Sequence, residues 1–98
     1  MNRRTLTLKS AEKLINHDRM EEYGSPKKSF GTIARFWGEF LGCDITPTQV
    51  AVMMTLLKIA RVKQAPPKQD SYDDMCGYSA LAAELAIGEL TDDEKTTL

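Results

Sequence analysis

The chain has 98 residues, a length that allows one domain with a modest hydrophobic core. Its 13 basic and 14 acidic residues give a net charge of −1, which disfavours nucleic acid as a partner, and 42% apolar residues exclude a disordered chain. No apolar run approaches the roughly 20 residues of a membrane span, and no apolar segment follows the basic N-terminus as in a signal peptide. We therefore expect a cytoplasmic protein with no membrane partner.

Apolar residues at helical spacing predict a first helix from Thr7 to Tyr23, which Gly24 ends. Ser25 as N-cap and Pro26 at the first helical position then begin a second helix, which ends at Gly42. This second helix carries one apolar stripe made of Phe30, Ile33, Ala34, Trp37 and Leu41.

A capping box of Thr46 and Gln49 begins a third helix, which runs to about Lys63. Apolar residues occupy nearly all of its sides, a pattern typical of a central helix or of an oligomer interface. The residues concerned are Val50, Val52, Met53, Met54, Leu56, Leu57 and Ile59.

After a loop that contains two prolines, residues Ser71 to Asp74 resemble a capping box and predict a fourth helix that fades near Gly88. Residues 91–98 are expected to be a frayed, polar, acidic tail. The sequence thus predicts one all-α, four-helix bundle-like domain over residues 1–98, with its core at about 7–88, that forms a homo-oligomer. The short connections favour antiparallel neighbours.

The two cysteines, Cys43 and Cys76, are far apart and form no CxxC pair. They predict neither a disulfide scaffold nor a zinc site, and we expect both to be buried residues of a reducing compartment. The sequence gives no reason to expect haem or flavin. His17 is the only histidine, so a histidine-based metal site or catalytic triad is not expected.

Two cations, Lys58 and Arg61, are predicted on the buried side of the third helix, and three acids, Asp70, Asp73 and Asp74, begin the fourth helix. One interpretation is an internal salt-bridge cluster that holds the intervening loop. The other is a nucleotide site, in which the cations bind phosphate and the three acids bind Mg²⁺.

A second polar group lies at the end of the first helix and contains Arg19 and Tyr23. The group suits a helix terminus, where basic side chains offset the negative end of the helix dipole. It also suits the rim of a binding site, with Arg19 on phosphate and Tyr23 stacking on the ligand. Its full set is His17, Asp18, Arg19, Tyr23 and Gly24.

Over roughly residues 14–85, the spacing of these motifs resembles a small, uncharacterised helical domain family of tailed phages and prophages. The resemblance implies a phage origin and supplies no activity. The positions that carry it are Asp18, Arg19, Tyr23, Gly24, Pro26, Phe30, Trp37, Pro47, Lys58, Arg61, Asp70, Asp74, Gly77 and Tyr78.

A more distant similarity is to the all-α MazG-like nucleoside triphosphate pyrophosphatases, which are oligomeric and hold Mg²⁺ with an ExxE helix and an ExxD helix. Asp70 with Asp73 or Asp74 would stand in for the ExxD helix. The ExxE helix has no counterpart, because the second helix carries only Glu39. The similarity therefore implies a helical fold and a nucleotide pocket more than hydrolysis.

We therefore expect a phage protein that binds a nucleotide or related phosphate ligand through Lys58, Arg61, Asp70 and Asp74, with Arg19 and Tyr23 at the rim. Whether such a protein would also act as a degenerate pyrophosphohydrolase stays open. One alternative is a counter-defence or host-takeover protein that contacts a host protein or sequesters a nucleotide signal. Another is an accessory oligomer with an internal ion-pair cluster and no ligand.

Overall fold

The computed structural model describes residues 1–97, and within that range the chain is helical and contains no strand. The expected all-α class and single domain are therefore confirmed. The elements in chain order are α1 (Arg3–Lys13), the π-helical turn η1 (Leu14–Asp18), α2 (Arg19–Tyr23), α3 (Pro26–Leu41), α4 (Pro47–Gln64), α5 (Gln69–Ile87) and α6 (Asp92–Thr97). None of the described helices combines the length and the apolar character needed to cross a bilayer.

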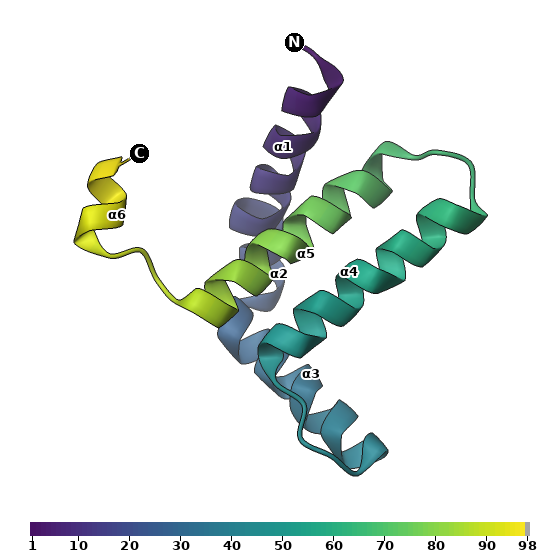
Figure 1. Cartoon of the computed structure of the whole chain (residues 1–98), viewed down its shortest axis with the longest axis vertical. Coiled ribbons are helices and arrows are strands. Elements are labelled where there is room, and N and C mark those ends of the chain that lie inside the picture. The colour runs from purple at the N-terminus through teal and green to yellow at the C-terminus, as the bar shows by residue number, and fades with distance from the viewer. Residues whose placement is uncertain (98) are drawn as a thin grey trace.

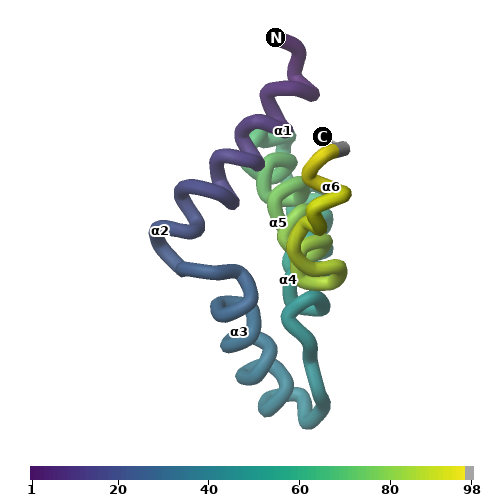
Figure 2. Tube along the Cα trace, turned by 90° about the vertical axis from the view of Figure 1, so that its left-hand side faces the viewer, coloured from purple at the N-terminus to yellow at the C-terminus, as the bar shows by residue number. Residues whose placement is uncertain are grey.

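The centre of the fold is the antiparallel pair of α4 and α5, whose contact is the most extensive between any two elements (Figure 1). A loop over residues 65–68 joins the two helices, so the predicted adjacency across the short loop is confirmed. Helix α1 packs against α5, and α3 packs against α4. Helices α1, α2 and α3 together form a layer on one side of the α4–α5 pair (Figure 2).

The buried core is small and apolar. Phe30 of α3 and Val50 of α4 are the largest side chains that are almost completely shielded from solvent. Their buried neighbours are Ala34, Ala51 and Leu81, and Ala11 is buried separately on α1. Gly38 lets the chain return close to α3, because a Cβ atom there would lie 2.7 Å from the backbone oxygen of Cys43.

The molecule is flatter and more open than a closed bundle. Its principal extents are 46 × 42 × 22 Å and its radius of gyration is 14.7 Å. A compact chain of this length has a radius of gyration of about 12.6 Å. The helices therefore form a more open arrangement than the expected four-helix bundle, and α6 is an additional short helix. This arrangement leaves much apolar surface outside the core.

The predicted caps of α3 and α4 are confirmed. The Ser25 hydroxyl accepts a hydrogen bond from the Lys28 backbone N–H. Thr46 and Gln49 form a reciprocal capping box, with donor–acceptor distances of 2.9 and 3.1 Å.

Three local predictions are wrong. The first helix begins at Arg3, not Thr7, because the Asn2 side chain caps it. Helix α5 begins at Gln69, so Ser71 lies inside it and no capping box forms there. Residues 92–97 form α6 because Thr91 and Glu94 make a capping box, whereas Leu98 lies outside the described residues.

The cysteine prediction is corrected as well. Cys43 is exposed, because it lies in the turn after α3, and Cys76 is partly buried on α5. Both are free thiols.

Candidate functional site

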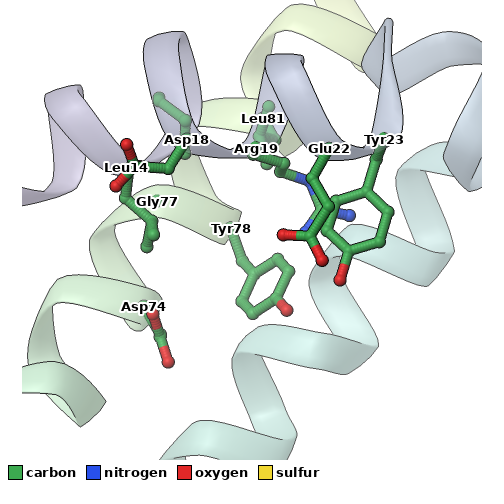
Figure 3. A pocket seen from close by; sticks show the side chains of 10 residues that line it. Leu14, Asp18, Arg19, Glu22, Tyr23, Asp74, Gly77, Tyr78 and Leu81 are labelled. Atoms are coloured by element: carbon green, nitrogen blue, oxygen red, sulfur yellow. The ribbon is translucent and has the colours of Figure 1, made fainter.

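The site begins with an irregularity in the first helical segment. The backbone N–H of Arg19 donates to the carbonyl of Leu14, five residues earlier, so η1 is wider than an α-helical turn. Such π turns hold one extra residue and change the direction in which the following side chains point. Here the turn directs Asp18, Arg19 and Glu22 toward α5 (Figure 3).

Arg19 is held by three aromatic rings that come from three helices. The Arg19 guanidinium carbon lies 4.6 Å from the ring centre of Phe30, 5.0 Å from Tyr23 and 5.7 Å from Tyr78. Cation–π attraction contributes about 0.5–1 kcal/mol for exposed pairs and more where water is excluded. The Arg19 Nε atom is buried and has no hydrogen-bond partner among the described residues. The rings thus fix this cation without neutralising its charge.

A pocket of about 220 Å³ lies beside Arg19. Three carboxylates line it, and they belong to Asp18 of η1, Glu22 of α2 and Asp74 of α5. In Figure 3 the ring of Tyr78 stands between Asp74 and the group formed by Arg19, Glu22 and Tyr23. The acids are therefore distributed around the pocket wall rather than gathered at one point.

Lys58 and Asp74 form an ion pair between α4 and α5. The Lys58 Nζ atom lies 2.9 Å from Asp74 Oδ2, and the two side chains are only 15% and 25% exposed. The pairing compensates the cost of removing both charges from water. This contact is part of the internal cluster expected from the sequence, and it also places a second cation next to the pocket.

The other predicted site residues lie elsewhere. Arg61 and Asp70 are exposed, at the end of α4 and the start of α5, and neither pairs with another residue in the range 1–97. Asp73 accepts a hydrogen bond of 2.7 Å from Gln69 Nε2. Of the three acids predicted to bind Mg²⁺, Asp74 alone lines the pocket. Within the described residues, no group of three or more His, Cys, Asp or Glu side chains is placed to hold a metal ion.

Glu22 lines the pocket although it was not among the residues predicted from the sequence. Asp18 and Glu22 are separated by four residues, a spacing that places two side chains on one helical face. The spacing therefore predicts a pair of carboxylates on one face of the first predicted helix, whereas the second predicted helix carries only Glu39.

A second hollow of about 620 Å³ shares Arg19, Tyr23 and Tyr78 with the pocket. Its remaining wall is mostly apolar, with Phe30, Ile33 and Met54 among its lining residues. Arg19 and the two tyrosines therefore separate an acidic compartment from an apolar one.

Comparisons with known proteins extend over this whole region. The sequence model of the family described as "Domain of unknown function (DUF6378)" matches residues 6–86, which include every residue of the pocket. The Gene 55 protein of Mycobacterium phage L5 is 40% identical over 83 residues, which make up 84% of this chain and 53% of that protein. The Gene 55 protein of Mycobacterium phage D29 is 40% identical over 72 residues, 74% of this chain and 48% of that protein.

The chain thus spans about half the length of these curated relatives. No solved structure matches. Because both relatives are phage proteins, the phage affiliation expected from the sequence is confirmed, whereas the similarity to MazG-like enzymes stays a prediction. On the family match and the shared identity, this chain is a member of the DUF6378 family of phage domains.

Proposed function

We propose that the protein binds a nucleotide, or a related phosphate compound, together with Mg²⁺ in the pocket around Arg19. The observation that carries the proposal is Arg19 itself, a cation held by three aromatic rings with no acidic partner among residues 1–97. A guanidinium fixed in this way loses little conformational freedom when a phosphate group binds to it.

The charges around the pocket favour a metal-bound phosphate over a free one. Asp18, Glu22 and Asp74 line the same pocket as Arg19, so they would repel an uncompensated polyanion. Mg²⁺ is usually held by one or two protein carboxylates together with water and substrate phosphates. Carboxylates spread around a pocket wall fit this mode, and the metal would neutralise the phosphate charge.

The apolar hollow on the other side of Arg19 suits the base of a nucleotide. Phe30, Ile33 and Met54 offer apolar surface there, and Tyr23 and Tyr78 offer aromatic faces. Stacking of a base on an aromatic side chain contributes about 1–3 kcal/mol. The ligand would then place its phosphates in the acidic compartment and its base in the apolar one.

A site for Mg-bound nucleotides would suit a protein of the host cytoplasm, where these compounds are abundant. It concerns binding, and hydrolysis is a separate property. If the protein binds without turnover, sequestration of a nucleotide signal, one of the alternatives raised by the sequence, becomes the mechanism.

A thermal-shift panel of nucleoside triphosphates and cyclic dinucleotides, each with and without Mg²⁺, tests the proposal. A ligand at about 100 times its Kd adds about 2.7 kcal/mol of stability, which raises Tm by roughly 11–22 °C in a domain of this size. Arg19→Met should abolish the shift, and Arg35→Met, which removes an exposed arginine of α3, should preserve it. The absence of any shift across the panel would refute the proposal.

Hydrolysis is measured in parallel. Wild-type protein is incubated with each nucleotide that shifts Tm, and pyrophosphate is assayed. Release that Asp74→Asn abolishes, while binding persists, would extend the proposal to an enzyme of the pyrophosphohydrolase type.

The second candidate is an accessory homo-oligomer without a ligand, in which the polar residues only hold the helices together. The partly buried Lys58–Asp74 pair favours it, because removing one partner leaves the other charge partly shielded from water and unpaired, whatever the protein binds. Unfolding of Asp74→Asn combined with a silent ligand panel is the result that this candidate predicts.

A further inference from the structure

The outward face of α4, on the side away from α5, is apolar and exposed to solvent. The helix carries no charged residue from Pro47 to Leu57. Val50 and Ala51 face the interior, and Leu56, on the opposite side of the helix, is 57% exposed. The apolar residues that share the outward face with Leu56 are Val52, Met53 and Ile59, each at least 39% exposed. We call these four residues the α4 face, and Figure 1 shows that α4 forms one edge of the molecule.

The apolar surface continues from the α4 face onto the end of α3. Met53 lines a hollow of about 260 Å³ together with Trp37, Phe40 and Leu41. Phe40 is 89% exposed, although a phenylalanine is among the residues most often buried in proteins. Two helices that pack against each other thus present one continuous apolar surface to solvent.

The solvent-accessible area of the molecule is larger than that of a typical monomer, as expected if a partner normally covers part of the surface. The molecule exposes 7408 Å², whereas a monomer of this mass exposes about 5,600 Å². The excess of about 1,800 Å² is larger than the roughly 800 Å² that each partner contributes to a stable dimer. Part of it belongs to α6, which packs against no other described element.

We infer that the α4 face binds the α4 face of a second copy of this chain in a symmetric dimer. A single patch that serves both partners is what two-fold symmetry requires. We expect the two α4 helices to run antiparallel, with the two-fold axis near Leu56, because this places Lys63 of one copy far from the partner's Lys63. A parallel pair would bring these two cations together near the ends of α4, where they would repel each other.

In this arrangement the two α4–α5 pairs lie side by side as one four-helix layer, with the two α4 helices at its centre, and the apolar α4 face of each molecule is covered. The Arg19 pocket is lined by η1, α2 and α5 and by no residue of α4, so it stays open to ligand in the dimer. The apolar hollow meets α4 only at Met54, which is not part of the α4 face, so ligand binding and dimer formation can be tested separately.

Light scattering coupled to size-exclusion chromatography measures the dimer directly. The wild type should have twice the chain mass of 11.0 kDa, and Leu56→Glu should have the mass of one chain, with dimer affinity reduced at least about 100-fold. Leu8→Glu is the matched control, because Leu8 is also exposed, at 64%, and lies on α1 away from the α4 face. Far-UV circular dichroism checks that each variant stays helical.

Disulfide crosslinking tests the geometry, and it also works if Leu56→Glu fails to fold. In a Cys43→Ser, Cys76→Ala background, Leu56→Cys should form a covalent dimer under mild oxidation, because a residue near a two-fold axis meets its own copy. Glu12→Cys, on the exposed side of α1, should not. A monomeric wild type, a dimer that Leu56→Glu leaves intact, or equal crosslinking of both cysteines would overturn the inference. A monomer that forms a complex with a host protein through this face would overturn it too.

Discussion

At the scale of single residues, the carboxyl of Glu84 has a raised pKa in the folded chain. Partial burial raises the pKa of its carboxyl, and the neighbouring Glu89 raises it further by charge repulsion and a shared hydrogen bond. Glu84 lies in the last turn of α5, where the helix dipole also disfavours negative charge, and Glu89 follows the C-cap residue Gly88. Glu84 therefore binds its proton more tightly in the folded chain than in the unfolded chain.

The sign of the pH effect follows from linkage. Because the folded-state pKa of Glu84 is raised, its contribution to stability is present at acidic pH and is lost as the pH rises through that pKa. Glu84→Gln should therefore have a higher Tm than the wild type at neutral pH and nearly the same Tm at acidic pH. Glu12→Gln, which removes an equal charge from α1, is the control. An equal Tm difference at both pH values would contradict the assignment.

Arg19 and Arg61 show how far single residues could be predicted. Both were singled out as phosphate-binding cations, yet Arg19 alone lines the pocket. Arg61 follows Leu57 by one helical turn, and Leu57 is 42% exposed, so the two share a solvent-facing side rather than the buried stripe. The rings around Arg19 come from α2, α3 and α5, and a sequence does not reveal such a meeting of three helices.

At the scale of elements, the π turn η1 sets the register between α1 and the pocket. Residues before it pack α1 against α5 through Ala11, and residues after it supply Arg19. Apolar periodicity predicts one continuous helix here, because a single extra residue in a turn leaves no compositional trace.

Deleting Asn16 should convert the π turn into an ordinary α-helical turn. Because a π turn absorbs one extra residue, the side chains after the deletion keep nearly the same direction relative to α1, and Ala11 and Arg19 keep their packing. We therefore expect a change of less than about 1 kcal/mol in the free energy of unfolding, measured by urea unfolding, and a preserved ligand-induced Tm shift. Deleting Ser10 from the regular part of α1 is the control, because it rotates Arg3 and Thr7 by about 100° away from Gln69 and should destabilise the protein by about 1–3 kcal/mol. Equal destabilisation by the two deletions would show that the turn does not absorb the extra residue.

The ends of the helices were predictable from the sequence only where a local capping residue sets them. The starts of α3 and α4 were predicted correctly because their capping residues act locally. The start of α5 was misplaced because no local cap defines it. Its first turn is held instead by Gln69, which hydrogen-bonds to Thr7 across 62 residues of sequence and to Arg3 at 2.9 Å.

At the scale of the whole molecule, α6 stands apart from the body of the protein (Figure 1). Truncation after Leu90 removes α6 and should change the free energy of unfolding by less than about 0.5 kcal/mol, because no helix packing is lost. Removing residues 1–8, an equal length, deletes Thr7 and Arg3 with their hydrogen bonds to Gln69 and should lower Tm clearly. A large loss of stability after the C-terminal truncation would show that α6 docks on the body in solution.

The arrangement of α4 and α5 also bears on the order of folding. The two helices are joined by only four residues, and their contact is the most extensive in the molecule. Contacts close in sequence form fastest, because little chain entropy is lost in closing a short loop. We therefore expect this hairpin to form first and α1 to α3 to join it later. Arg19 would then meet Tyr78 only in that last step, so the pocket would be assembled late.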